Sequence, residues 1–240
     1  MSKKKLIALA LVVIMIATVS FSTLAWFTDT DAAKNDFTIG GAGQGDVDKI
    51  FSVDVKENVD GKETAVDGMT FEDILPGDVY KKDAYVTNTG SYDQYIRVTM
   101  TISDWELIKD VVTIKMDEEF RDYWHVVSDG VDIDEDCNLY TFIDDSIDEN
   151  GNLVVVMYLD SKLEYAADGL NTVYIMDEVS VSPEATQKDF IAEGFADGFY
   201  IDINAEAVQT RNILAEDEYS EYEWENAVAT FAKLETAAQP

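Results

Sequence analysis

The chain has 240 residues, 47% of them apolar, and carries 49 acidic against 17 basic side chains, a formal net charge of −32. A surface this acidic repels nucleic acid and anionic lipid, which excludes electrostatic binding to either, and it also repels copies of itself. The single cysteine, Cys137, excludes an internal disulfide framework, so the fold has to be stabilised by its core.

The first 25 residues have the three-part layout of a secretory signal peptide. Lys3–Lys5 precede an apolar run, Leu6–Phe21, and Thr23 and Ala25 supply small residues at positions −3 and −1 of a cleavage site. The run is shorter than the roughly 20 residues that span a bilayer, which favours cleavage before Trp26 over an uncleaved membrane anchor. Cleavage removes three lysines and no acid, and so changes the formal charge from −32 to −35. The mature chain is therefore expected outside the cytoplasm and not in a membrane.

Residues 26–45 are predicted to form an N-terminal arm. Its middle, Thr28–Asp36, is polar, and four glycines within residues 40–45 form a flexible joint to the remaining domain. This joint lacks the spacing of a phosphate-binding loop. The apolar anchors of the arm are Trp26, Phe27, Phe37 and Ile39.

Alternating apolar and polar residues predict antiparallel strands in the remaining chain, residues 46–240. The clearest cases are 95–103 and 199–207, where every second residue is apolar, the pattern of a strand with one buried face. Further strands are expected at 51–55, 79–87, 123–127, 139–143, 153–159 and 172–181.

Few segments have helical periodicity. Asn150-Gly151 predicts a hairpin turn that joins strands 139–143 and 153–159. Short helices are expected at 104–110, 182–192 and 217–234. Together these features predict an all-β fold, an antiparallel β-sandwich or jelly roll with two or three short helical insertions.

The only histidine, His125, limits the available catalytic machinery. One histidine excludes an HExxH motif and any zinc site with two histidines. Because His125 lies in an aromatic, strand-like run, it is interpreted as a packed or edge-strand residue and not as a catalytic base. No catalytic residue and no cofactor are predicted.

An acidic loop offers a candidate for weak calcium binding. Asp132, Asp134 and Asp136 have the alternation of an EF-hand start, and calcium prefers several oxygen ligands from one loop. However, Cys137 occupies the place of the EF-hand glycine, and no glutamate closes the loop. The alternative interpretation is a solvated acidic edge.

Several fragments, in order along the chain, resemble the TasA/camelysin family of exported proteins of Gram-positive bacteria. They cover about 60 positions, mainly within 3–40, 71–103 and 199–210, and 104–198 match no family pattern. The fragments are Lys3-Lys4-Lys5 with the apolar run, Thr23-Leu24-Ala25-Trp26-Phe27, Lys34-Asn35-Asp36-Phe37-Thr38-Ile39-Gly40, Phe71-Glu72-Asp73-Ile74-Leu75-Pro76-Gly77-Asp78, Thr87-Asn88-Thr89-Gly90-Ser91 and Ile203-Asn204-Ala205-Glu206-Ala207-Val208-Gln209-Thr210.

The resemblance implies a jelly-roll subunit of extracellular biofilm-matrix fibres, processed by a signal peptidase of the SipW type. In such fibres the N-terminal arm of one subunit adds as a strand to the next, so the expected partners are other copies of the chain and other matrix proteins. The alternatives are that the arm pairs within its own sheet and that the protein is a surface adhesin or ligand-binding module. A camelysin-like protease is disfavoured because the zinc ligands are missing.

We predict that the exported protein begins at Trp26, because Thr23 and Ala25 present the small residues that a signal peptidase requires. N-terminal sequencing and intact mass of the secreted protein measure this directly. A chain that still starts at Met1 contradicts the prediction, and so does a start beyond Phe37.

Overall fold

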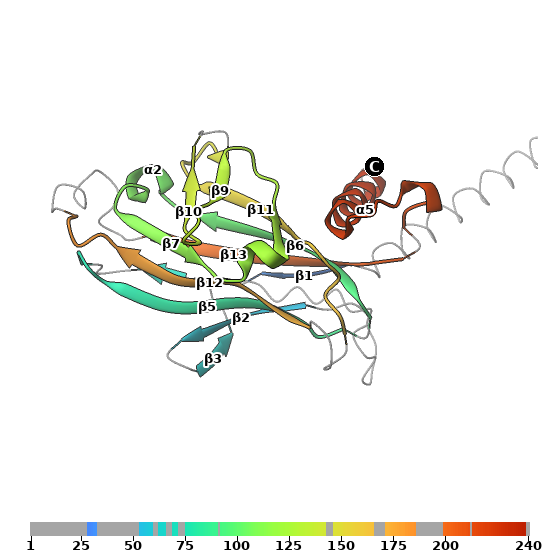
Figure 1. Ribbon diagram of the computed structural model, residues 1–240, viewed down its shortest axis with the longest axis horizontal. Helices are drawn as coiled ribbons and strands as arrows, with labels where there is room; N and C mark the ends of the chain where they lie inside the picture. The colour runs from blue at the N-terminus through green and yellow to red at the C-terminus, as the bar shows by residue number, and fades with distance from the viewer. Residues whose placement is uncertain are drawn as a thin grey trace, which may run out of the picture.

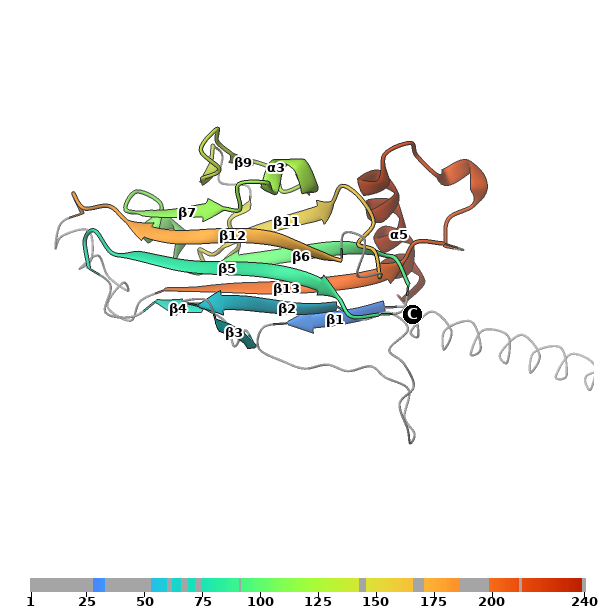
Figure 2. The ribbon, with the colours of Figure 1, turned by 60° about the horizontal axis from the view of Figure 1, so that its bottom comes forward.

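The protein folds as two antiparallel β-sheets packed face to face, which confirms the predicted β-sandwich (Figures 1 and 2). The computed structural model describes residues 28–32, 53–59, 62–65, 69–71, 75–90, 92–142, 146–165, 171–185, 199–211 and 213–238. No helix within these ranges is long and apolar enough to cross a membrane. The predicted signal peptide and the glycine joint lie outside the described residues, as do the domain boundaries drawn there.

The first sheet is centred on β13 and β6. Its strand order is β1 (Thr28–Ala32), β13 (Phe199–Gln209), β6 (Gln94–Ile102), β11 (Leu153–Leu159) and β8 (Trp124–Val126), and β4 (Met69–Phe71) also pairs with β13. The long pairing of β13 with β6, from Ile201 opposite Ile102 to Gln209 opposite Gln94, makes this pair the backbone of the sheet.

The second sheet faces the first and is centred on β5 and β12. Its order is β3 (Lys62–Ala65), β2 (Val53–Val59), β5 (Val79–Asn88), β12 (Thr172–Val181) and β7 (Val112–Met116). The chain crosses between the sheets from β5 to β6 to β7 and again from β11 to β12 to β13, as expected of a jelly roll.

The core lies between the sheets and is formed by the inward residues of alternating strands. In β13, Phe199, Ile201, Ile203, Ala205 and Ala207 are buried, and the residues between them point outward. The same alternation buries one face of β6. Strict alternation thus correctly identified both strands, since a one-residue shift would expose every apolar side chain.

Two of the fragments quoted for the family resemblance form turns, one at each end of β5. In Leu75–Asp78 the Asp78 carboxylate accepts the Leu75 amide at 2.8 Å, and Gly77 has a φ of 88°, a conformation that favours glycine. At the other end, Asn88 is buried, donates to the Leu163 carbonyl oxygen at 2.9 Å and accepts the Gly90 amide at 2.8 Å. Both motifs are therefore structural.

Helices and small strands differ in part from the sequence-based expectations. The described helical elements are α2 (Trp105–Ile108), α3 (Phe120–Tyr123), a 3-10 turn η3 (Glu216–Glu218) and α5 (Glu223–Ala238). Those at 104–110 and 217–234 were expected, whereas α3 and strand β7 were not. The helix expected at 182–192 lies largely outside the described residues.

The predicted hairpin between 139–143 and 153–159 is wrong. Strand β10 (Leu139–Thr141) pairs with β9 (Val131–Ile133) in a separate small hairpin instead. Asn150-Gly151 does form a tight turn, but the residues that it brings together, Ile147 and Leu153, form an isolated bridge. A local turn signal cannot identify which strand its flanks will join, because pairing is decided by long-range packing.

The C-terminal helix α5 packs on the outer face of the first sheet at one end of the sandwich (Figures 1 and 2). Ala227 and Phe231 of the helix pack on a second apolar cluster that contains the outward residues Tyr95, Tyr158 and Val208. The Phe231 ring meets the Tyr158 ring edge-on at 5.8 Å between centroids. This helix explains why β6, β11 and β13 carry apolar residues on both faces near one end.

Replacing Phe231 by Ala is expected to destabilise the fold by about 3 kcal/mol, because it empties a buried aromatic position in the cluster under α5. Denaturant unfolding measures the change. The exposed neighbour Ala232 supplies the control, because Ala232→Ser should change stability by no more than about 0.5 kcal/mol. A loss below about 1 kcal/mol for Phe231→Ala would show that α5 is not anchored as described.

Candidate functional site

The candidate site is the outer edge of β13, where a short N-terminal strand is paired. β1 runs antiparallel to β13, from Thr28 opposite Val208 to Ala32 opposite Asn204. Beyond it, β4 pairs with Phe199–Ile201 on the same edge. Each strand thus satisfies part of a row of backbone N–H and C=O groups that would otherwise be exposed as a template for pairing.

In the single chain this arrangement differs from the expectation, implied by the resemblance, that the arm pairs with the next subunit. Thr28–Ala32 pair within their own sheet, as the alternative interpretation required. The polar sequence of this stretch fits an edge position, and unpaired backbone groups on β13 favour its pairing. The predicted cleavage residue Ala25 and the arm anchors Trp26, Phe27, Phe37 and Ile39 lie outside the described residues.

A polar pocket of about 340 Å³ lies where β13 ends and α5 begins. Its lining residues are Tyr95, Lys162, Thr210, Arg211, Tyr219, Ser220, Glu223 and Asn226. The loop before α5 is fixed by buried Asn226, which accepts the Ser220 amide at 2.7 Å and donates to the Ser220 carbonyl oxygen at 3.1 Å. The pocket wall is thus preformed.

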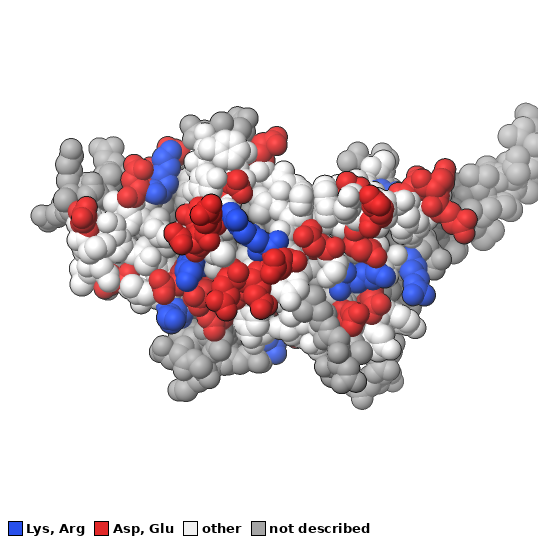
Figure 3. Space-filling view, viewed as in Figure 1, with Lys and Arg blue, Asp and Glu red and all other residues white. Residues whose placement is uncertain are grey.

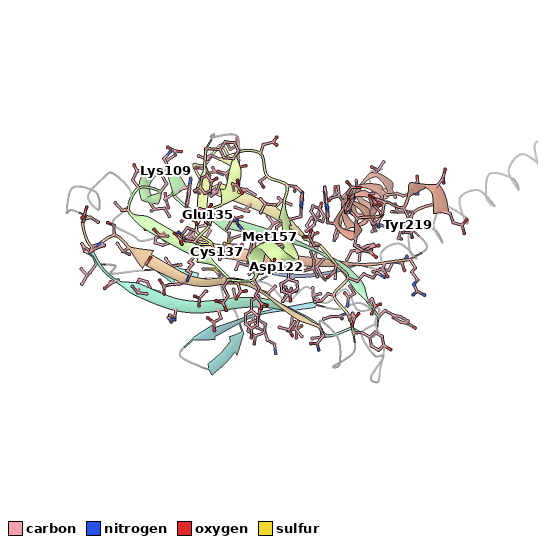
Figure 4. The ribbon with its side chains drawn as sticks, in the orientation of Figure 1. Lys109, Asp122, Glu135, Cys137, Met157 and Tyr219 are labelled. Carbon is pink, nitrogen blue, oxygen red and sulfur yellow. The ribbon has the colours of Figure 1, made fainter. Side chains whose placement is uncertain are left out.

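Glu223 organises the floor of this pocket. Its carboxylate accepts the Tyr95 hydroxyl at 2.8 Å and lies 3.5 Å from the Lys162 ammonium. Burial and the hydrogen bond with Glu223 both raise the pKa of Tyr95, so the hydroxyl remains the donor. Figure 4 shows Tyr219 at the outer end of the loop that precedes α5. The pocket combines a carboxylate, two cations and two aromatic rings.

His125 is used in packing. It lies on the edge strand β8, and its ring stacks on the Trp224 ring of α5 at 3.7 Å between centroids with an interplanar angle of 14°. The interpretation of His125 as a packed histidine on an edge strand is confirmed. The contact provides a further anchor of α5 on the first sheet.

The acidic residues considered for calcium belong to the β9–β10 hairpin. The Asp134 carboxylate accepts the backbone amides of Asp136 and Asn138 at 2.9 and 2.8 Å, and chiefly the Asn138 bond lowers its pKa. Asp132 accepts the Tyr140 hydroxyl at 3.2 Å. In the described part of the chain, no three His, Cys, Asp or Glu side chains gather as a metal site. Weak calcium binding stays a prediction.

Cys137 follows this acidic loop and has a left-handed backbone, with a φ of 64°. Its thiol lies 3.8 Å from the Glu118 carbonyl oxygen, so the hairpin rests against the segment before α3 (Figure 4). Cys137 therefore has a left-handed backbone, which favours glycine, the residue that an EF-hand has at this position. Here, however, the turn connects two paired strands.

A second acidic feature, on the outer face of the second sheet, was not identified from sequence. A groove of about 370 Å³ is lined by Asp83, Lys115, Asp117, Glu118, Tyr174 and Asp177. Burial first, and then the charge and hydrogen bond of Asp177, raise the pKa of Asp83. Figure 3 shows acidic side chains gathered on the face that carries β5, β12 and α3. The register of β5 and β12, which brings Asp83 and Asp177 together, has no local sequence signal.

Comparison with known proteins adds no assignment. No protein-family model matches the sequence, and no characterised protein matches it significantly. Function must therefore be argued from the site itself.

The Asp83–Asp177 pair is expected to make stability depend on pH. Because the folded pKa of Asp83 is raised, its contribution is fully present below the unfolded aspartate pKa of about 3.9 and is lost as pH rises through the folded value. Asp83→Asn should therefore raise Tm relative to the parent chain more at pH 7 than at pH 4.

Thermal unfolding of both proteins at the two pH values measures the difference. Asp93→Asn is the matched control, because Asp93 is half-buried but lines no such groove. An equal effect of Asp83→Asn at both pH values would mean that the pKa of Asp83 is not raised in the folded protein.

Proposed function

We propose that the protein is a secreted structural subunit of extracellular matrix fibres, polymerised by addition of the N-terminal arm of one copy to β13 of the next. The observation that carries this proposal is the pairing of Thr28–Ala32 with Asn204–Val208. The pairing uses backbone groups on an edge strand, a recurrent mode of recognition by strand addition. It can be made with another chain through the same hydrogen bonds.

The position of β1 in the chain favours exchange between copies. Residues 33–52 separate β1 from β2, the next described strand, so β1 is joined to the domain by a long connection on one side only. If cleavage occurs before Trp26, β1 starts two residues from the free end. A terminal strand with a long connection can leave its own sheet and enter a neighbour's without breaking the pairing of β13 with β6.

When β1 of one copy replaces β1 of another, the contacts made between chains are the same as those made within one chain. Whether copies associate therefore depends on protein concentration and on charge repulsion. The arm of one copy entering the next is a head-to-tail contact, and one that does not close into a ring forms a filament. A mature charge of −35 opposes such assembly. Salt, divalent cations or acid reduce that repulsion, which is consistent with assembly outside the cell.

The sequence resemblance supports the same role independently. The fragment Ile203–Thr210, which resembles a late family strand, contains every residue of β13 that pairs with β1. The arm and its acceptor are therefore both within the resembling regions. The protease alternative gains no support, since the sole histidine stacks on Trp224.

A pair of proline substitutions tests strand addition. In an edge strand the N–H groups of successive residues point alternately toward the neighbour and toward solvent, and proline removes the N–H group. Of Asp29→Pro and Thr30→Pro in β1, one should abolish filaments seen by electron microscopy, and the other should preserve them. Each variant serves as the control for the other.

Both proteins should remain folded by circular dichroism, because the long pairings of β13 with β6 and of β12 with β5 do not involve β1. Filaments from both variants would contradict the proposal. Absence of filaments from the mature parent protein in calcium, at high salt and at pH 5 would contradict it as well.

A further inference from the structure

We propose that the pocket between the end of β13 and the start of α5 binds an acidic sugar, a hydroxylated ring that carries one carboxylate. The pocket volume of about 340 Å³ lies at the small end of the range for ligand sites and suits a single sugar ring. The proposal goes beyond the fibre and is independent of it, because none of the β13 residues that pair with β1, Asn204–Val208, lines the pocket.

Two cations converge on this pocket, although the chain has 49 acidic against 17 basic side chains. Lys162 is positioned by its buried neighbour Leu163, which exchanges backbone hydrogen bonds of 2.9 and 3.1 Å with Gln94. Arg211 is exposed, and among the described residues its guanidinium has no ion-pair or hydrogen-bond partner. A planar fork of N–H donors matches a carboxylate, which makes Arg211 the anion-binding residue of the pocket.

The charge of the lining selects a ligand with a single negative group. Of the described residues that line the pocket, only Glu223 is acidic. Its carboxylate accepts the Tyr95 hydroxyl at 2.8 Å and lies 3.5 Å from the Lys162 ammonium, so it offsets the charge of that cation. Two cations and one carboxylate leave the lining with a charge of +1. One carboxylate on a ligand neutralises this charge, whereas Arg211 would repel a cationic ligand.

The uncharged groups of the lining select a hydroxylated ring over an apolar acid. None of the described residues that line the pocket has a hydrocarbon side chain, so an apolar ligand would gain little there. The Thr210 hydroxyl both donates and accepts, and the Glu223 carboxylate has acceptor sites beyond the one that Tyr95 uses. Tyr219, 39% exposed, adds a ring face for the C–H groups of a sugar. A carboxylate, several hydroxyls and one apolar face occur together in an acidic sugar.

The fixed wall of the pocket favours binding of so small a ligand. Tyr95 and Asn226 are 2% and 4% exposed, and Asn226 holds the Ser220 backbone through hydrogen bonds of 2.7 and 3.1 Å. Little of the wall therefore has to become ordered when a ligand enters, which reduces the free-energy cost of binding.

Titration of the mature full-length protein with three probes tests the site. Glucuronate carries both the ring and the carboxylate, glucose carries the ring alone, and acetate stands for the carboxylate of a peptide side chain. We expect glucuronate to shift the amide NMR signals of Arg211, Tyr219 and Ser220 saturably, with a dissociation constant of about 0.1 to 10 mM. Glucose and acetate should each bind at least about tenfold more weakly, because each lacks one of the two recognised groups.

Matched variants identify the residues that bind. Arg211→Gln should weaken glucuronate binding at least about tenfold, since it removes charge-assisted hydrogen bonds, and Tyr219→Ala about threefold. Lys233→Gln is the control for charge, because Lys233 pairs with Glu218 at 2.7 Å and does not line the pocket. Tyr222→Ala is the control for the ring, because Tyr222 is in the same loop, 54% exposed, and does not line the pocket.

Four outcomes overturn the proposal. Equal affinity for acetate and glucuronate would mean that any carboxylate is bound, including that of a peptide side chain. Equal affinity for glucose would remove the role of Arg211. The proposal also fails if Lys233→Gln weakens binding as much as Arg211→Gln does, or if no saturable shift appears by about 50 mM glucuronate.

Discussion

The structure depends most on the backbone pairing of β13. One edge of this strand is bonded to β6 over nine positions, and the other is shared by β1 and β4. Its inward residues form part of the sandwich core, and its outward Val208 packs under α5. A strand fixed on one edge and on both faces is rigid, so its remaining edge is a well-defined acceptor for a short strand.

Helix α5 is the second element that holds β13 in place. Arg97, which faces outward from β6, forms an ion pair with Glu206 of β13 and another with Glu235 near the end of the helix. Its guanidinium also lies 4.5 Å from the centre of the Phe231 ring. One side chain therefore connects two strands and the helix. Because Arg97 and Glu206 are largely shielded from water, their ion pair is stronger than a surface ion pair, whereas Glu235 is exposed and its pair with Arg97 adds less.

Charge acts on the molecule at two scales. Over the whole surface the excess of acids opposes association, an effect that salt screens within about 10 Å. Locally, burial and then the neighbouring Asp177 carboxylate raise the pKa of Asp83, whereas backbone amides lower the pKa of Asp134. The acids therefore do not titrate as one population, and the response of stability to acid will reflect a few specific sites.

The sequence by itself determined the fold class and most strands, because a strand with one buried face shows a period of two that no other element imitates. The stretches 153–159 and 172–181 coincide with β11 and β12. The α5 helix was evident from apolar residues spaced along one face. The packed position of His125 was also predicted, from its aromatic neighbours in the sequence.

Only the tertiary structure decided which elements meet. The pairing of β1 with β13, the pairing of β10 with β9 and the approach of Asp83 to Asp177 all join segments that carry no mutual signal in the sequence. The pocket beside α5 is likewise assembled from four separate stretches of the chain. Local patterns identify the face that each element buries. Its partner is selected by the packing of the whole core, because many registers satisfy the same local pattern.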